Sequence, residues 1–315
     1  MVQITKENYK DIPALILDNG TLKLTFLPEY GGKLASMIDK RSNREVLLQT
    51  PNEKYLVQPY DGDYTTGECS AFDDMFPTID PVAYPDFPWK NAVMPDHGEV
   101  CALPWKYTVD GDSVTMTVSG VRFPYTLTKT VTFEAADRVK ISYTAENNSP
   151  YPLDYIYAAH LMINVEDGGE ILLPGAGKAT WGFSRFPAEA SYGDKLVWPT
   201  VKFSDGTSVD LSKTPAFDID GNNYKFFLDE PLKAGWCGYR YADGSCFKLH
   251  FSPDELPAFC LWVNEGWFHG FRNIALEPCS APYDRVDIAR LHNASSVLPP
   301  FGKKEWTLCM ECGAK

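Results

Sequence analysis

The sequence predicts an all-β protein, built as a large antiparallel β-sandwich. The dominant hydrophobic period along the chain is two residues, and turn-forming Asp, Asn and Gly residues separate the periodic segments. A helical pattern occurs weakly and in one place, residues 282–291, with Asp284 placed to cap it. Alternating strands joined by turns rather than by long helices are typical of a sandwich and argue against βαβ units.

The individual elements follow from this alternation. Apolar and polar residues alternate most regularly in residues 22–26, 114–118 and 139–145, which we expect to be half-buried strands. Short runs that tolerate positive φ fall between periodic segments, and we expect turns at residues 18–20, 110–112, 167–169, 205–206, 220–222 and 243–244. No low-complexity linker and no repeat interrupts the pattern. We therefore expect a single domain over residues 1–315.

Composition limits the classes of partner. The chain has 315 residues, of which 44% are hydrophobic, so it can bury a large core. Its formal net charge of -13 disfavours binding to nucleic acid and to anionic membrane surfaces. Residues 1–6 open no signal peptide, and no segment reaches the roughly 18 apolar residues that a membrane helix needs. We expect a cytoplasmic protein without nucleic-acid or membrane partners.

The eight cysteines are scattered through the chain, which lacks an export signal, so we expect reduced thiols. Cys309 and Cys312 have the CxxC spacing of zinc or redox sites. A second ligand pair or a following helix would be needed for either role, and the sequence has neither. We expect no metal and no redox centre there.

Two segments rich in proline and aromatic residues, 58–90 and 181–199, break the strand pattern, and we expect them to be functional loops. The first contains Asp73 and Asp74 among aromatic residues. Carboxylates beside aromatic rings suit a sugar, whose hydroxyls bind the carboxylates while its apolar face lies on a ring. The alternative is that Asp73 caps a loop or helix and Phe76 fills the core.

Glu277 is the first candidate for chemistry. It ends the apolar run 274–276 and is followed by Pro278, which cannot donate to a ladder, so strand pairing should stop beside it. A carboxylate that emerges from a core into a cleft has a raised pKa and is suited to act as a base. The alternative is a strand-end carboxylate that faces solvent or pairs with Arg272.

Two of the five histidines stand out. His97 follows the first long loop, and His160 ends an aromatic strand over residues 155–160. An imidazole donates a proton as readily as it accepts one near neutral pH, so His160 is a candidate general acid if it faces a cleft. The alternative is a core histidine whose hydrogen bonds are satisfied. His269 is a candidate for the rim of a site.

Several short motifs, in order along nearly the whole chain, resemble those of the aldose 1-epimerase superfamily, the galactose mutarotase-like proteins. They are residues 24–37 (LTFLPEYGGKLASM), 97–98, the strand-borne His160, 276–278 and 281–282. The resemblance implies a β-sandwich of the supersandwich type with an open carbohydrate cleft on a concave sheet face. It also implies that Glu277 is the general base, His160 the general acid and His97 a sugar-binding residue.

The chain departs from galactose-specific members in two places. Where they have an Asp-His pair before an aromatic strand, residues 221–227 read GNNYKFF, and the expected Asn-Arg pair of the early loop is replaced near residues 72–77. The identity of the sugar therefore stays open. The candidate substrate-binding residues are His97, Asp73, Asp74, Lys225 and Trp267, with Trp262 and Trp181 as further candidates for stacking.

Interconversion of sugar anomers fits these residues without a cofactor. A base removes the proton of the anomeric hydroxyl while an acid protonates the ring oxygen, and the opened ring recloses from the other face. Three alternatives stay open: a non-catalytic carbohydrate-binding protein, a hexose-phosphate epimerase, and a metal-dependent isomerase with His97, Glu99, His160 and Glu277 as ligands. The candidate phosphate-binding residues would be Arg122, Lys129, Arg185 and Lys225. The oligomeric state is not predicted.

Overall fold

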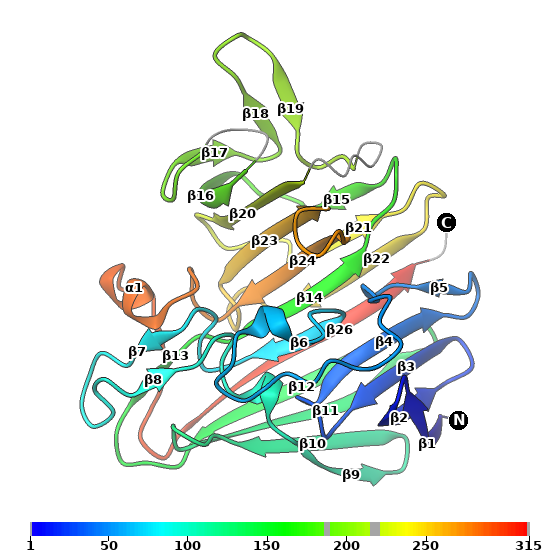
Figure 1. Ribbon diagram of the computed structural model, residues 1–315, viewed down its shortest axis with the longest axis vertical. Coiled ribbons are helices and arrows are strands. Elements are labelled where there is room, and N and C mark those ends of the chain that lie inside the picture. The colour runs from blue at the N-terminus through cyan, green and yellow to red at the C-terminus, as the bar shows by residue number, and fades with distance from the viewer. Residues whose placement is uncertain (1, 186–189, 215–220, 314–315) are drawn as a thin grey trace.

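The computed structural model describes residues 2–185, 190–214 and 221–313 and confirms an all-β sandwich made of two large antiparallel sheets. Within these residues the larger sheet has 14 strands and runs along the longest axis of the molecule (Figure 1). In spatial order its strands are β1 (Gln3–Tyr9), β2 (Ile12–Asp18), β3 (Leu22–Leu27), β4 (Lys33–Asp39), β6 (Phe72–Met75), β14 (Ala158–Asn164), β24 (Arg272–Cys279), β23 (Ala258–Glu265), β20 (Asn222–Leu228), β16 (Lys178–Ser184), β17 (Lys195–Val197), β18 (Thr200–Lys202) and β19 (Ser208–Asp210), with β5 (Arg44–Glu45) paired to β4.

The smaller sheet has eight strands among the described residues. In spatial order they are β15 (Glu170–Leu172), β21 (Trp236–Arg240), β22 (Cys246–Phe251), β26 (Lys303–Gly313), β12 (Arg138–Asn147), β11 (Tyr125–Ala135), β10 (Ser113–Ser119) and β9 (Lys106–Asp110). The remaining elements are two short ribbons, two 3₁₀ turns and one helix: β13 (Leu153–Tyr155) with β25 (Ser296–Leu298), β7 (Val82–Ala83) with β8 (Val93–Met94), Tyr64–Thr66, Val100–Ala102 and α1 (Val286–Leu291).

The core lies between the two sheets because alternate residues of each strand point inward. Leu161 of β14 and Leu276 of β24 belong to the same buried cluster as Ile141 of β12 and Leu308 of β26. The residues between these inward-facing positions therefore point away from the smaller sheet. His160 on β14 and Glu277 on β24 occupy such outward positions.

The strands predicted at residues 22–26, 114–118 and 139–145 are confirmed as β3, β10 and β12. The predicted turns join consecutive strands at four places, residues 18–20, 110–112, 205–206 and 243–244. Residues 167–169 lead into β15, and the turn at 220–222 lies partly outside the described residues.

Three expectations are wrong in detail. The segment 181–199 is not loop throughout, because its described residues include the end of β16 and all of β17. The segment 58–90 is not loop throughout, because it contributes β6, which pairs with both β4 and β14. Its two adjacent carboxylates are accommodated in the sheet because each meets a buried lysine. The helix is shorter than expected and begins after Arg285, since the carboxylate of Asp284 binds Lys225 instead of capping the helix.

The described residues contain no helix with the length and hydrophobicity needed to cross a membrane. All eight cysteines lie in the described part of the chain, and none forms a disulfide. Cys309 and Cys312 both lie on β26.

Candidate active site

Strand register brings His160 opposite Glu277. The pairs Ala158↔Cys279 and Leu161↔Leu276 join β14 to β24, and the positions between them place the two side chains beside one another on one face. The sequence predicts that strand pairing stops beside Glu277, and this is wrong on one side of the strand. Pairing of β24 with β23 continues through Pro278 to Cys279. The ladder with β14 skips positions 277 and 278, which is where the missing N–H of Pro278 removes a donor.

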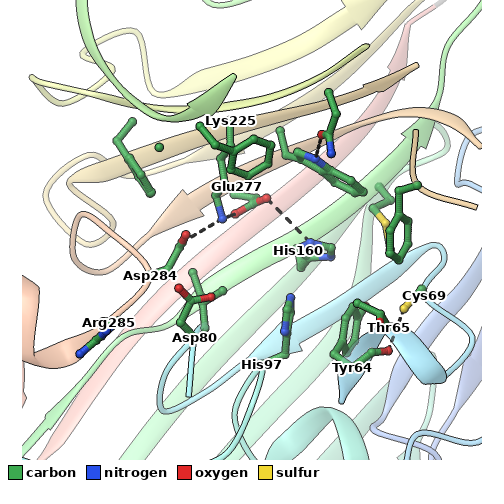
Figure 2. Close-up of a pocket in the computed structure, with 18 of the residues that line it drawn as sticks. Tyr64, Thr65, Cys69, Asp80, His97, His160, Lys225, Glu277, Asp284 and Arg285 are labelled. Atoms are coloured by element: carbon green, nitrogen blue, oxygen red, sulfur yellow. Dashed lines mark hydrogen bonds and ion pairs between the residues drawn. The ribbon is translucent and has the colours of Figure 1, made fainter. Parts of the chain in front are cut away.

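A cavity opens over this pair. Its volume is about 370 Å³, within the roughly 300–1,000 Å³ range of small-molecule sites. The cavity brings together most of the residues singled out in the sequence, namely Glu277, His160, His97, Lys225 and Trp267. Figure 2 shows Glu277 between His160 and Lys225, with His97 and Asp80 on the opposite side of the cavity.

Glu277 is fully buried from solvent, yet neither carboxylate oxygen has a hydrogen-bond partner among the described residues. Oε1 lies 3.9 Å from Nε2 of His160, and Oε2 lies 3.6 Å from Nζ of Lys225. Burial raises the pKa of the Glu277 carboxyl, and the charge of Lys225 opposes that shift. A buried carboxylate with unused acceptors is costly unless water or a ligand completes its hydrogen bonds.

His160 is also buried, and its Nδ1 has no hydrogen-bond partner among the described residues. Its ring lies over Trp262, with 6.1 Å between centroids, and meets the ring of Tyr64 edge-on. Burial lowers the pKa of His160 well below its ordinary value, and the ammonium groups of Lys225 and Lys33 lower it further. The free protein therefore favours the neutral imidazole.

No sugar-sized gap separates His160 from Glu277. The two side chains stand next to each other on neighbouring strands, because the register places them directly opposite. They approach without forming a hydrogen bond, and both face the cavity rather than the core.

Lys225 reaches the same cavity from β20. Its Nζ donates to the carboxylate of Asp284 at 2.8 Å, in the segment that follows β24. Burial by itself would lower the pKa of Lys225, but the carboxylates of Asp284 and Glu277 outweigh it and raise that pKa well above its ordinary value. Lys225 is therefore a permanent cation beside the candidate base.

His97 lies on the opposite wall and is held by two neighbours. Its Nδ1 is hydrogen-bonded to Asp96 at 2.8 Å, and its ring stacks on Tyr64 with 4.0 Å between centroids. Asp96 also accepts from the backbone N–H of Tyr64, so one carboxylate positions both rings. His97 has a positive φ of 56°, which turns the chain into the cavity before Gly98.

No protein-family model and no curated protein matches the sequence. Solved structures do match over the whole chain. A galactose mutarotase-like protein from Clostridium acetobutylicum is 14% identical with a TM-score of 0.68, and the match covers 100% of this chain and 99% of that one. One from Lactobacillus casei is 16% identical with a TM-score of 0.67, covering 95% and 99% of the two chains. The chain has the galactose mutarotase-like fold.

A galactose mutarotase related enzyme from Lactobacillus acidophilus is 12% identical, with a TM-score of 0.66 and coverage of 96% of this chain and 97% of that one. These likenesses confirm the fold that the sequence motifs implied. At such identities the assignment of roles must come from the geometry of this chain.

Within the galactose mutarotase-like fold, Asp73 and Asp74 do not line the cavity, which corrects their expected role as direct sugar contacts. Asp73 lies opposite His160 across β6 and β14, but it is covered by Tyr64, whose hydroxyl donates to it at 2.7 Å, and it pairs with Lys33. Asp74 points into the core, where Lys129 binds it at 2.7 Å. Adjacent strand residues face opposite sides, so the two cannot share one surface.

Several cavity residues escaped the sequence analysis as parts of a site, and Asp284 and Tyr64 are two of them. Asp284 was considered there only as a helix cap, although a carboxylate shortly after the 281–282 motif was a usable signal. Tyr64 carries no sequence signal, because the 3₁₀ turn Tyr64–Thr66 is brought to the cavity by tertiary contacts. His269 lies near the site and its ring contacts Phe268, but it does not line the cavity.

In the described part of the chain, no three His, Cys, Asp or Glu side chains lie close enough together to hold a metal ion. Glu99, one of the four candidates, turns away and accepts hydrogen bonds from Tyr60 and from the backbone N–H of Arg122.

Proposed function

We propose that this protein interconverts the α and β anomers of a sugar, as a cofactor-independent mutarotase, with Glu277 as the general base and His160 as the general acid. The observation that carries this proposal is the buried Glu277 carboxylate, which has no hydrogen-bond partner in the described part of the chain and lies 3.9 Å from Nε2 of His160 at one wall of a cavity. Such a pair is arranged for a ligand rather than for stability.

The spacing of the two groups suits the two oxygens that must exchange protons. The anomeric hydroxyl and the ring oxygen are bonded to the same carbon, so an acid and a base that stand side by side can reach both. Glu277 takes the hydroxyl proton while Nε2 of His160 gives a proton to the ring oxygen, and the ring C–O bond breaks to leave an aldehyde. Rotation of the aldehyde and reclosure with reversed proton transfers yield the other anomer.

Other cavity residues are suited to hold the sugar. Lys225 donates and Asp284 accepts, so this pair can bind neighbouring hydroxyls with both hydrogen-bond polarities. His97 presents its second ring nitrogen from the opposite wall, since Asp96 occupies Nδ1. Trp262, beside His160, offers an apolar surface for the face of a sugar ring.

A neutral sugar is favoured over a sugar phosphate. Of the four cationic candidates for phosphate binding, only Lys225 lines the cavity, and it is already paired with Asp284. Arg285, a further cation at the cavity, is paired with Asp287. A phosphate group would have to compete with the carboxylates of Asp284 and Asp287 for the cations Lys225 and Arg285.

The test is anomer exchange measured by NMR on a panel of aldoses. Replacing Glu277 by Gln keeps the shape and removes the basic oxygen, so we expect the exchange rate to fall about 100-fold to 10,000-fold. Glu146→Gln is the matched control, because Glu146 is exposed on β12 in the other sheet, and its exchange rate should stay that of the parent. An active Glu277→Gln variant, within a fewfold of the parent, would show that Glu277 is not the base. Sugar binding without exchange in the parent would favour a carbohydrate-binding protein.

A further inference from the structure

Three large aromatic side chains stand exposed where the cavity opens. The exposed fractions are 41% for Phe183, 56% for Tyr192 and 51% for Trp267, and all three line the same cavity as Glu277. Of the other seven tryptophans, Trp105, Trp181, Trp198 and Trp306 are buried, and Trp89, Trp236 and Trp262 are half-buried. Exposed aromatic rings that gather at a cavity are typical of binding surfaces, since their apolar faces otherwise meet water.

The three residues, named here the aromatic rim, come from separate elements. Phe183 lies on β16 opposite Lys225 of β20, so it shares the face of the sheet that carries the cavity. Trp267 lies in the turn between β23 and β24, where the guanidinium of Arg185 is 5.9 Å from its ring centroid. Tyr192 precedes β17 and lies near Tyr283, with 6.5 Å between ring centroids. Convergence of distant segments at one mouth indicates a built surface.

In the proposed function, the inner part of the cavity binds one sugar ring, the ring that carries the anomeric carbon. For anomer exchange, the anomeric carbon must reach Glu277 and His160, which are both buried. The remainder of a larger substrate would then extend toward the mouth, where the exposed rings of the aromatic rim lie. Sugar rings present apolar C–H faces that pack on aromatic rings, while their hydroxyls remain in water.

We propose that the aromatic rim is a subsite for a second sugar unit, so that the substrate is a reducing disaccharide or a longer reducing oligosaccharide. This inference rests on the proposed function for the placement of the reducing ring at Glu277. The second unit is attached to the reducing ring at a carbon other than the anomeric carbon of that ring. It lies across Trp267, Phe183 and Tyr192.

The kinetic test compares anomer exchange of reducing disaccharides, such as maltose, cellobiose and lactose, with that of their monosaccharides. We expect kcat/KM to be about tenfold higher for the preferred disaccharide, and Trp267→Ala to remove that advantage by lowering the disaccharide value more than the monosaccharide value. Phe87→Ala is the control, since Phe87 is 68% exposed but does not line the cavity.

A binding measurement separates the subsite from the chemistry. The 1,5-anhydro derivatives of the same disaccharides keep both rings but lack the anomeric hydroxyl, so they cannot exchange, and their binding is followed by ligand-observed NMR. Binding that Trp267→Ala weakens about tenfold supports the subsite even if no sugar is exchanged. The inference is overturned, with the proposed function intact, if monosaccharides exchange at least as fast as every disaccharide and Trp267→Ala affects both equally.

Discussion

Burial shifts the pKa values of Glu277 and His160 in opposite directions, and each shift favours the neutral form of its group. Burial raises the pKa of the Glu277 carboxyl above 4.5, which favours its neutral acid form. Burial lowers the pKa of the His160 imidazole below 6.5, which favours its neutral base form. The proposed reaction needs both groups charged. The surroundings therefore narrow the pH range in which the productive pair is populated.

We expect a narrow bell-shaped dependence of kcat/KM on pH. Activity falls as the pH drops through the raised pKa of Glu277, because the base becomes protonated. Activity also falls as the pH rises through the lowered pKa of His160, because the acid loses its proton. The profile is measured by NMR exchange from about pH 4 to about pH 8, with thermal unfolding at each pH as the control for an intact fold.

A rate that keeps rising through neutral pH would contradict the assignment of His160 as the acid. Lys225 would then be the group to examine, because its pKa is raised and its ammonium lies 3.6 Å from Glu277. His160→Gln would distinguish the two, since it abolishes exchange only if the imidazole supplies the proton.

At the scale of elements, β6 links the cavity to the core. Its two adjacent carboxylates point to opposite faces, and each is neutralised by a lysine from another strand, Lys33 of β4 for Asp73 and Lys129 of β11 for Asp74. Asp73 also binds the Tyr64 hydroxyl, so this side of β6 supports the ring on which His97 stacks. On the other side, the hydroxyl of Tyr157 donates to Asp74 at 2.8 Å, deep between the sheets.

We expect Lys129→Met to destabilise the protein by about 3–5 kcal/mol, because it leaves the Asp74 carboxylate buried without its cation. Urea unfolding followed by fluorescence measures the loss. The double variant Lys129→Met with Asp74→Asn should recover much of the stability, since no uncompensated charge remains. Lys304→Met, at an exposed position of β26, should change stability by less than about 0.5 kcal/mol. A Lys129→Met variant as stable as that control would show that Asp74 needs no partner.

At the scale of the whole molecule, one hydrophobic cluster contains residues of both sheets, from Leu15 of β2 to Met310 of β26. The C-terminal strand belongs to this arrangement, since β26 pairs with both β12 and β22 in the smaller sheet. We propose that residues 1–315 form a single domain, because no part of the sandwich could separate without dividing this cluster.

A single domain predicts cooperative unfolding. Tryptophan fluorescence and far-ultraviolet circular dichroism should give coincident urea transitions, because the tryptophans of both sheets report on one shared core. Two separated transitions, or a stable fragment after limited proteolysis, would instead indicate two domains.

The sequence by itself determined the all-β class and several individual strands. Period-two alternation at residues 139–145 reflects a local requirement, that one face of a strand is buried and the other is not, and β12 confirms it. Glu277 and His160 were identifiable as candidates because each places an ionisable group in an otherwise apolar strand.

Only the tertiary structure decided which of these groups meet. The opposition of His160 and Glu277 depends on the register of β14 against β24, and the Lys225–Asp284 pair depends on β20 lying two strands from β24. The packing of β6 between the sheets turns Asp74 toward Lys129 of the smaller sheet and away from the cavity, against the expectation drawn from its aromatic neighbours. Alternation is a local property that a sequence displays directly, whereas strand order and register come from long-range packing, which no short segment specifies.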